Sequence, residues 1–404
     1  MAKSELLSVA MLSWEYPPRI VGGIAPHVYN LSRALSHREV DTYVVTCDFP
    51  GTLSREEIDG THVFRVDSYK NPSPDFASWI YLMNINMQKE AAEIISNTHG
   101  SINLIHAHDW LVADAVIGLK HIFRIPLVVT FHSTEIGRRN GLHTTYQRMI
   151  HETEVWLAHE AWKVLCCSNY MASHLSWAFG LPREKIEVIP NGVDVSIFDN
   201  DFDKTQLRSK YALPEEKLVL FVGRLVHEKG VHVLINSIPG VLAKVNAKFV
   251  IVGEGYMKDA LQGQVRSMGL SHKVLFAGFL DEQSLHSLYK CADVCVVPSL
   301  YEPFGITALE AMAAQVPVVV SDVGGLSEIV EHDKTGVKIY PNNPSSLAWG
   351  ITRVLLDTAY AKWIQLNAYQ KALETYSWDK ISDRTKNFYQ KILEEYNTSS
   401  WKPT

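Results

Sequence analysis

The chain has 404 residues, of which 47% are hydrophobic and 20% are charged, and it carries a formal net charge of −6. Its length exceeds the ~250–300 residues at which one hydrophobic core stops growing, so two domains are expected, and the composition excludes a disordered chain. The acidic balance argues against a general nucleic-acid binder, which would need a basic surface.

The N-terminal segment MAKSELLSVAML contains an apolar run that is too short for a signal peptide or a membrane span. The five cysteines are odd in number, lie mostly in apolar runs and form no Cys-x-x-Cys pair, so they are expected to be buried thiols and not metal ligands. We expect a cytoplasmic protein without a transmembrane segment, and nothing in the sequence specifies an oligomeric state.

Short apolar runs rich in Val, Ile and Leu recur along the chain, and helical stretches separate them. The runs are LLSVAML, TYVVTC, LIHAH, PLVVTF, KVLCCS, KIEVIP, KLVLFVG, KFVIVG, KVLFAG, DVCVVP and VPVVVS. Runs of this kind are typical of strands that are buried on both faces. Their alternation with helices predicts an α/β fold with two parallel, helix-flanked sheets.

The strand pattern is interrupted after residue 190, where PNGVDVSIFDNDFDKTQ collects turn-forming and acidic residues. We therefore predict Rossmann-like domains over residues 1–195 and 196–376. Residues 377–404 are expected to form a terminal helix that packs back on the body, because apolar residues recur at roughly helical spacing at Ile381, Phe388, Ile392 and Tyr396.

The first glycine-bearing turn lies between the first strand and a helix whose first turn holds Pro26. Gly22 and Gly23 would leave room there for a phosphate or a sugar against bare backbone amides. The segment is not Gly-x-Gly-x-x-Gly, so a nicotinamide cofactor is not expected. Many α/β proteins carry a glycine in this turn, and the motif alone indicates little.

Two histidine segments, HAHDW and TFHSTEIGR, follow strands of the first half. His132 comes directly after the run PLVVTF and is either a structural residue or part of a ligand pocket. Asp109 would offer a carboxylate to sugar hydroxyls, and Trp110 an indole face to a sugar ring. The alternative for Trp110 is a core residue at a helix start.

In FVGRLVHEKG, Arg224 and Lys229 follow one strand of the second half. Two cations at one strand end indicate a clamp for a diphosphate, because Arg binds phosphate oxygens through its planar fork and Lys as a point charge. The alternative is a pair of surface charges balanced by Glu228.

The segment SLYEPFGITALEAMAA follows the strand DVCVVP and is the most specific signal. Pro303 favours a helix entry that begins near Phe304, with Glu302 in the loop and Glu310 inside the helix. The first-turn amides would then be free to bind an anion or sugar hydroxyls, and Glu310 would accept from a ribose diol. These amides belong to Phe304, Gly305, Ile306 and Thr307. The alternative is a purely structural role for Glu302 and Glu310, as carboxylates near a helix start that the positive end of the helix dipole stabilises.

No metal site is expected. Asp201-Phe202-Asp203 is an Asp-x-Asp, but it lies in the acidic linker and is predicted to be a solvated turn. The chain contains no His-Glu-x-x-His and no Gly-x-Ser-x-Gly, so zinc hydrolysis and serine esterase chemistry find no support.

With these motifs the chain resembles glycosyltransferase family 4, a retaining family with the GT-B fold. The likeness covers nearly the whole chain and rests on EPFGITALE, which is similar to the family's Glu-x7-Glu motif, and on GRLVHEKG, VIPNGVD, VGEG and VPVVVSDVGGLSEIV in their usual order. It implies two facing Rossmann-like domains with parallel sheets and an interdomain cleft, the first for the acceptor and the second for a nucleotide-sugar donor.

The resemblance also implies roles for the residues that match. Arg224 and Lys229 would hold the diphosphate and Glu310 the ribose. The donor sugar would be held by Glu302, His132 and the amides of Phe304, Gly305, Ile306 and Thr307, with Gly22 and Gly23 approaching the phosphate. Catalysis would depend on His132, Arg224, Lys229 and Glu302, and Asp109 and Trp110 would contact the acceptor.

Within this family, SWEYPPRIVGGIAPHV and HAHDW look most like bacterial and archaeal glycogen synthases and related α-glucan or maltose 1-phosphate synthases. The Lys-x-Gly-Gly-Leu-Gly-Asp signature of the larger bacterial enzymes is replaced here by Arg19-Ile-Val-Gly-Gly-Ile-Ala. The match implies retaining transfer of a hexose, chiefly glucose, from UDP-glucose or ADP-glucose to an α-glucan or glucose-based acceptor, with no cofactor.

Three alternatives stay open at this point. The first is a family 4 transferase for another small sugar, a sugar phosphate or a lipid. The second is a catalytically silent sugar-binding protein on the same fold, and the third is a nucleotide-sugar epimerase. Because the sequence offers no obvious nucleophile, the transfer is expected to proceed by front-face substitution, with the donor phosphate taking the acceptor proton.

Overall fold

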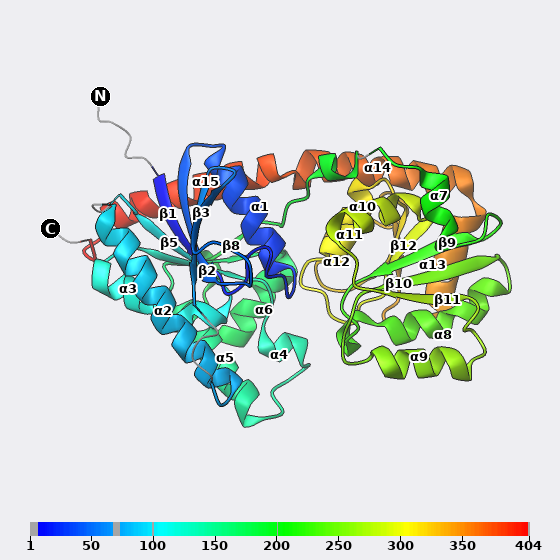
Figure 1. The fold of residues 1–404 in the computed structure, drawn as a ribbon, viewed down its shortest axis with the longest axis horizontal. Helices are drawn as coiled ribbons and strands as arrows, with labels where there is room; N and C mark the ends of the chain where they lie inside the picture. The colour runs from blue at the N-terminus through cyan, green and yellow to red at the C-terminus, as the bar shows by residue number, and fades with distance from the viewer. Residues whose placement is uncertain (1–6, 68–72, 99–100, 200, 403–404) are drawn as a thin grey trace. The chain divides into compact units, whose positions relative to one another are not determined.

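The computed structural model describes residues 7–67, 73–98, 101–199 and 201–402 (Figure 1). The chain divides into two compact units, one of Met1–Gly192 with Trp378–Thr404 and the other of Val193–Ser377. The sequence predicted domain boundaries after residues 195 and 376, and the two units of the structure divide after residues 192 and 377. The opening Leu6 of the first predicted strand lies outside the described residues.

In the described part of the first unit, eight strands form one sheet in the order β3-β4-β2-β1-β5-β6-β7-β8. Neighbouring strands are parallel except for β3 and β4, which form an antiparallel hairpin at one edge. The strands are β1 (Leu7–Leu12), β2 (Val40–Cys47), β3 (Arg55–Ile58), β4 (Thr61–Val66), β5 (Leu104–His108), β6 (Leu127–Phe131), β7 (Lys163–Cys166) and β8 (Ile186–Val188).

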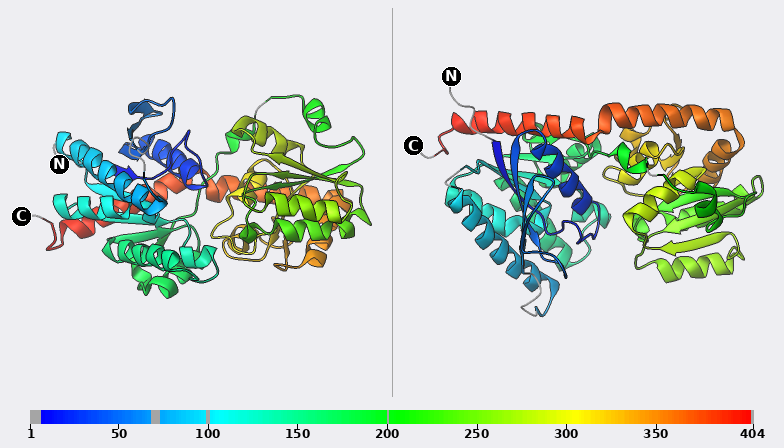
Figure 2. Two further views of the ribbon diagram at one scale, coloured as in Figure 1. Left: turned by 60° about the horizontal axis from the view of Figure 1, so that its bottom comes forward. Right: turned by 45° about the horizontal axis from the view of Figure 1, so that its top comes forward.

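Helices flank both faces of this sheet, as the further views in Figure 2 show. They are α1 (Ile24–Ser36), α2 (Phe76–Asn97), α3 (Ala113–Phe123), α4 (Glu135–Arg138), α5 (Thr145–Glu160), α6 (Asn169–Phe179) and α15 (Trp378–Asn397), with the 3-10 turns η1 (Trp110–Val112) and η2 (Arg183–Lys185). The α5 helix begins at a capping box formed by Thr144 and Gln147.

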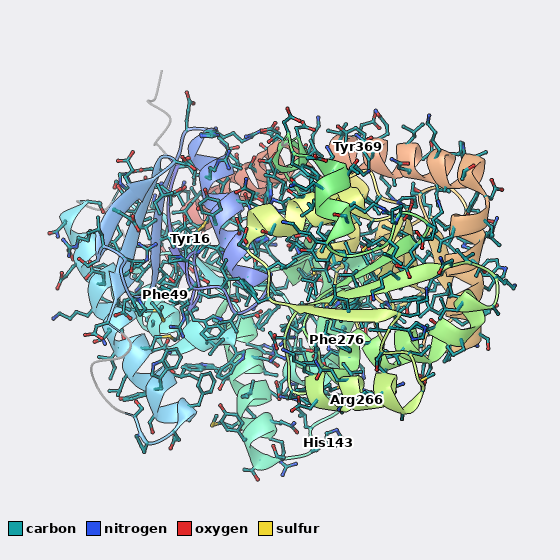
Figure 3. The ribbon with its side chains drawn as sticks, turned by 45° about the vertical axis from the view of Figure 1, so that its right-hand side comes forward. Tyr16, Phe49, His143, Arg266, Phe276 and Tyr369 are labelled. Atoms are coloured by element: carbon teal, nitrogen blue, oxygen red, sulfur yellow. The ribbon has the colours of Figure 1, made fainter. Side chains whose placement is uncertain are left out.

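The terminal helix α15 packs on the first unit. Its Ile381, Phe388 and Ile392 share one hydrophobic core with α1 and the central strands. Tyr16, labelled in Figure 3, belongs to the same core and is 1% exposed. Tyr396 is only partly buried, and its hydroxyl donates to the carbonyl of Arg124 at 2.5 Å.

In the described part of the second unit, six parallel strands form a sheet in the order β11-β10-β9-β12-β13-β14. The strands are β9 (Lys217–Val222), β10 (Ala247–Val252), β11 (Val274–Gly278), β12 (Val294–Val297), β13 (Val318–Ser321) and β14 (Val337–Ile339). The helices are α7 (Lys204–Ser209), α8 (Val231–Leu242), α9 (Lys258–Ser267), α10 (Glu282–Cys291), α11 (Ile306–Ala313), α12 (Leu326–Ile329), α13 (Pro344–Leu356) and α14 (Thr358–Tyr376), with the 3-10 turns η3 (Val195–Phe198) and η4 (His227–Lys229). The core of this unit joins α8, α9 and α13 to the strands.

The predicted α/β fold with two parallel sheets is confirmed, because every apolar run named from the sequence forms a strand. All five cysteines are buried, as expected. Within the described residues, no helix combines the length and the apolar character that crossing a membrane requires.

Candidate active site

In each sheet, successive strands first add to one side of the opening strand and then to the other, so the strand order reverses once. The predicted site residues gather at these two points of reversal. In the first unit the reversal falls between β1 and β5, and in the second between β9 and β12. Loops at the carboxyl ends of the two strands diverge at such a point and leave a crevice, which is where open α/β sheets bind ligands.

At the reversal in the second sheet, the structure joins the two motifs that the sequence singled out. Lys229 lies in η4 after β9, and its Nζ is 2.7 Å from Oε2 of Glu302, which follows β12. Ser299 donates to the same oxygen at 3.0 Å. The Glu302 side chain is 10% exposed and that of Lys229 is 23% exposed, so the pair is partly shielded from water.

Gly230 holds these two loops together. It adopts φ +68, which favours glycine, and a Cβ at this position would lie 2.0 Å from the carbonyl oxygen of Pro298. A side chain at position 230 would therefore separate the β9 loop from the end of β12 and pull Lys229 away from Glu302.

Arg224 is the more exposed cation of the predicted clamp. Its guanidinium lies 3.5 Å from Glu228, and 54% of its side chain is exposed. This contact agrees with the alternative in which Arg224 balances Glu228. An exposed pair at this distance contributes little to stability, so the guanidinium can leave Glu228 for a phosphate at small cost.

The helix that carries Glu310 begins later than the sequence suggested. It starts at Ile306 and not at Phe304, because Gly305 takes φ +116, outside the helical region, and acts as the N-cap. The amides without an intrahelical partner are therefore those of the first turn from Ile306 onward, including Thr307, and they carry the positive end of the helix dipole. Phe304 and Gly305 precede the helix.

Glu310 lies in the second turn of α11, half-buried beside α10. Its Oε2 accepts a hydrogen bond from the Tyr289 hydroxyl at 2.8 Å. Burial raises the pKa of Glu310 to about 7, the Tyr289 hydroxyl lowers it and the charge of Glu282 raises it further. The carboxyl group consequently changes its charge near neutral pH.

In the first unit, a buried carboxylate fills the turn in which bare amides were expected. Glu15 is 1% exposed, and its Oε2 accepts from the amides of Val21 at 2.6 Å and Gly22 at 3.0 Å. The expectation that Gly22 offers a bare amide is therefore corrected. Gly23 follows as the N-cap of α1.

Asp109 and Trp110, which the sequence suggested for the acceptor, are both buried. Asp109 is 2% exposed, and its Oδ1 accepts from the amide of His132 at 2.7 Å. It adopts φ +57, in the left-handed region, directly after β5. Trp110 is 7% exposed and lies in the core at η1. The burial of Trp110 agrees with the alternative of a core residue at a helix start, and the Asp109 carboxylate is engaged with the His132 amide.

His132 follows β6 and belongs to a group of three imidazoles. Its Nε2 lies 3.2 Å from Nδ1 of His108, and its ring packs edge-to-face on that of His27 with centroids 4.7 Å apart. Burial lowers the pKa of His132 to about 4 and lowers the pKa values of His27 and His108 as well. All three rings are therefore neutral at pH 7.

Glu15 and His27 were not identified from the sequence as members of this region, and His108 was noted only as part of the segment HAHDW. A single histidine at a helix start, such as His27, is a weak signal. Asp203 is the N-cap of α7, where its carboxylate accepts from the amide of Gln206 at 2.9 Å, and Asp201 is exposed in the preceding turn. Their contacts agree with a solvated turn.

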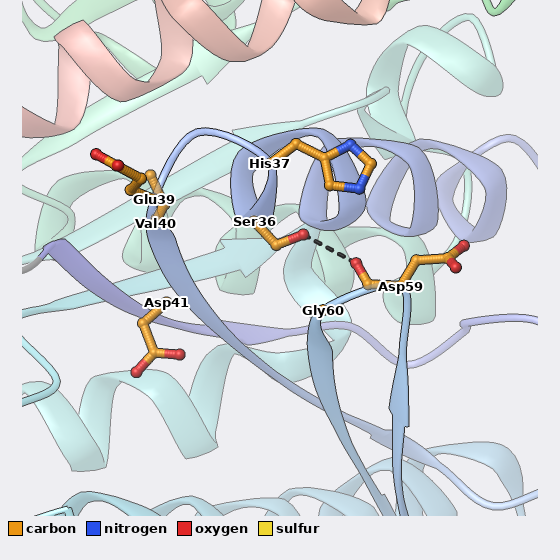
Figure 4. A pocket seen from close by; sticks show the side chains of 7 residues that line it. All are labelled: Ser36, His37, Glu39, Val40, Asp41, Asp59 and Gly60. Atoms are coloured by element: carbon orange, nitrogen blue, oxygen red, sulfur yellow. Dashed lines mark hydrogen bonds between the residues drawn. The ribbon is translucent and has the colours of Figure 1, made fainter.

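A separate pocket of about 320 Å³ lies at the opposite, amino ends of β2 and β4 (Figure 4). Its lining is polar and acidic, and comprises Ser36, His37, Glu39, Val40, Asp41, Asp59 and Gly60. It contains none of the residues that the sequence motifs identified, so the candidate active site is assigned to the carboxyl ends of the strands.

Comparison with known proteins identifies two matching families. Residues 21–197 match the model described as Glycosyltransferase Family 4, and residues 203–371 match the one described as Glycosyl transferases group 1. An uncharacterized glycosyltransferase of Methanocaldococcus jannaschii is 42% identical over 394 residues, which cover 96% of this chain and 99% of that protein.

A glycogen synthase of Mycobacterium tuberculosis is 34% identical over 399 residues, which cover 95% of this chain and 94% of that enzyme. Among solved structures, a sucrose-phosphate synthase from Thermosynechococcus elongatus superposes with a TM-score of 0.83 at 24% identity and covers 96% of this chain and 100% of its own. The structural likeness establishes the fold as GT-B.

Proposed function

Because the chain belongs to the group 1 and family 4 glycosyltransferases, we propose that it transfers glucose, with retention, from UDP-glucose or ADP-glucose to an α-glucan or another glucose-based acceptor. That it is a glycosyltransferase follows from the family. Membership favours a transferase over an epimerase, and the transfer assay described below separates an active transferase from a catalytically silent sugar-binding protein.

The ion pair between Lys229 and Glu302 is the observation that carries the proposal. It brings a cation and a carboxylate to the same sheet reversal, beside the first-turn amides of α11. The cation and the amides suit a diphosphate, and the carboxylate suits sugar hydroxyls. Among the described residues, the Glu302 side chain accepts from Lys229 and Ser299 through Oε2, and we assign Oε1 to the donor sugar.

Glu310 is assigned to the nucleoside. A carboxylate in the second turn of α11 can accept paired hydrogen bonds from the two hydroxyls of a ribose. The Tyr289 hydroxyl, at 2.8 Å, fixes the rotamer in which it does so. Diphosphate, donor sugar and ribose are then bound by consecutive parts of one loop and helix, from Glu302 to Glu310.

In this mechanism the charge that develops on the leaving diphosphate is stabilised by Arg224, Lys229 and the first-turn amides of α11. Such preorganised donors act where the charge develops and need no reorganisation. The acceptor hydroxyl attacks from the face that the leaving group vacates and passes its proton to a phosphate oxygen, which retains the anomeric configuration. His132 is proposed to contact the donor sugar, and no metal or cofactor is required.

With Asp109 and Trp110 buried, another group of side chains is the better candidate for the acceptor. Phe76 stacks on Trp79 with ring centroids 5.5 Å apart, and Trp79 meets Trp14 edge-to-face at 6.3 Å. The Arg19 guanidinium lies 5.4 Å from both indole rings. Trp14 follows β1 and Phe76 begins α2, so the cluster lies at the carboxyl edge of the first sheet, and Phe76 is 48% exposed. Sugar rings stack on such aromatic faces.

The test is a transfer assay with UDP-glucose and ADP-glucose, each with and without glycogen and maltooligosaccharides, read by mass spectrometry and by NMR of the new anomeric centre. An α-linked, elongated glucan supports the proposal. Transfer to a sugar phosphate or lipid alone would reject the glucan acceptor and leave the transferase assignment in place. A β-linked product would reject retention. Similarity to the glycogen synthase over 95% of the chain supports a glucan as the first acceptor to test.

A further inference from the structure

Three histidines from separate elements of the first unit meet at the carboxyl edge of its sheet. His27 lies in α1, His108 ends β5, and His132 follows β6. One ring nitrogen of each lies within 4.8 Å of the others. The sequence separates these residues widely, so the cluster is a product of the fold.

The spacing approaches that of ligands around one metal ion. Zn²⁺ binds imidazole nitrogen at about 2.0–2.1 Å, so tetrahedral ligand atoms lie about 3.3 Å from one another. Nδ1 of His108 and Nε2 of His132 are 3.2 Å apart. The ring centroid of His27 is 4.7 Å from that of His132 and 5.5 Å from that of His108. The His27 nitrogen lies within 4.8 Å of the other two, so it has to move closer when an ion binds.

His108 Nδ1 and His132 Nε2 are within hydrogen-bond distance of each other, but three other buried nitrogens of this cluster lack the hydrogen bonds that a structural role would give them. Among the described residues, neither ring nitrogen of His27 makes a hydrogen bond of acceptable geometry, although Asn191 lies close enough to raise its pKa. Nε2 of His108 is also without a partner. These two residues are 6% and 0% exposed, so water does not readily supply the missing bonds.

The neighbouring His106 shows what a structural histidine looks like in this sheet. It is fully buried, its Nδ1 lies 2.6 Å from the Tyr389 hydroxyl and its Nε2 lies 2.7 Å from Oγ1 of Thr130. Both of its ring nitrogens are satisfied, whereas those of His27 are not. The contrast separates a packed histidine from His27, whose buried ring nitrogens lie in the cluster without a hydrogen bond of acceptable geometry.

We propose that His27, His108 and His132 form a binding site for a divalent transition metal of the Zn²⁺ class. Imidazole nitrogen is a preferred ligand of such ions, and three histidines leave the fourth tetrahedral position to water or another ligand. His132 is only partly buried and forms the outer side of the cluster. The ion would not serve the transfer reaction. Because the proposed function assigns His132 to the donor sugar, a bound metal would withdraw that imidazole and inhibit transfer, a consequence that rests on the proposed function.

The test uses the full-length protein, treated with EDTA and then freed of chelator, in the absence of any nucleotide sugar. Calorimetric titration with Zn²⁺ is expected to show one ion bound per chain. Co²⁺ in its place is expected to give the intense visible absorption of a tetrahedral site. His27→Gln and His108→Gln are each expected to weaken binding at least tenfold. His227→Gln is the matched control, because His227 stacks on His232 in the other unit with centroids 5.1 Å apart and forms no part of the cluster.

Absence of binding, equal binding by wild type and His27→Gln, or equal loss in His227→Gln would overturn the proposal and indicate adventitious binding by surface histidines. Thermal melting by circular dichroism shows whether each variant folds. If neither cluster variant folds, crystals of the wild-type protein soaked in Zn²⁺ decide the matter, since an anomalous peak between the three rings supports the site and its absence overturns it. Inhibition is read separately: added Zn²⁺ should lower transfer by the wild type and spare His27→Gln.

Discussion

Donor binding should depend on pH through Glu310. Burial raises the pKa of this carboxyl to about 7, and the proposed function requires its ionised form to accept two hydrogen bonds from a ribose. Because of this raised pKa, the Glu310 carboxyl of the ligand-free protein is mostly protonated below about pH 7. The affinity for the nucleotide-sugar donor is therefore expected to rise as the pH increases through that value. The ionised fraction grows from about one tenth at about pH 6 to about nine tenths at about pH 8, which predicts about tenfold tighter binding.

The measurement is calorimetric titration with UDP-glucose and ADP-glucose across this range. Both phosphates of these donors are esterified, so the ligand charge stays constant and only the protein titrates. Glu310→Gln keeps the size of the side chain and should bind weakly with no pH dependence from this group. Glu282→Gln, which removes a charge that raises the pKa of Glu310, should move the midpoint to lower pH. A wild-type affinity that is flat over the range, or a Gln variant that keeps the wild-type pH profile, would refute the reasoning.

Lys229→Ala is expected to lower turnover about 10²-fold or more by removing leaving-group stabilisation. Lys334→Ala, which breaks an exposed ion pair with Glu331, should leave turnover unchanged, and equal turnover in both variants would reject the clamp. Turnover should survive dialysis against excess EDTA; complete loss that Mg²⁺ or Mn²⁺ restores would show that the reaction uses a metal. Burial raises the pKa of Asp109 from 3.8 to about 6. Between these two pH values the native state binds more protons than the unfolded chain, so the stability of the protein falls as the pH rises through this range. The unfolding free energy of Asp109→Asn, relative to the wild type, should therefore increase by about 2 kcal/mol between about pH 4 and 7, and a difference that does not vary with pH would contradict this. Phe76→Ala should slow transfer to a glucan while donor hydrolysis without acceptor stays near the wild-type rate; equal loss of both rates would remove the aromatic cluster from the acceptor site.

The elements found from the sequence are those whose signal is local. Continuous apolar runs such as KLVLFVG are typical of strands buried on both faces, and β9 and β10 are largely buried, whereas the edge strands β8 and β11 are only partly buried. The strands that were missed have mixed signals. In β3 the sequence REEI is charged because the strand lies at a solvent-exposed edge, β4 alternates buried and partly buried residues, and β14 has three residues. Edge position and pairing partners are tertiary properties, and a single stretch of sequence does not contain them.

The same division holds for the site. Spacing identified Lys229, Glu302 and Glu310, because a strand end followed by a glycine and a helix start places polar side chains where parallel strands bind ligands. It did not reveal that Lys229 and Glu302 pair with each other, since the pairing depends on β9 and β12 being neighbours in the sheet.

The sequence by itself determined the α/β class, the two parallel sheets and the residue types at the carboxyl ends of their strands, because hydrophobic periodicity and turn chemistry act over a few residues. Only the tertiary structure decided which way those side chains point. Asp109 turns inward to the amide of His132, Glu15 takes the amide of Gly22, and His27 reaches His132 from another element. Each of these contacts joins segments that the chain brings together only after folding, because burial in the shared core selects the side-chain directions that local sequence leaves open.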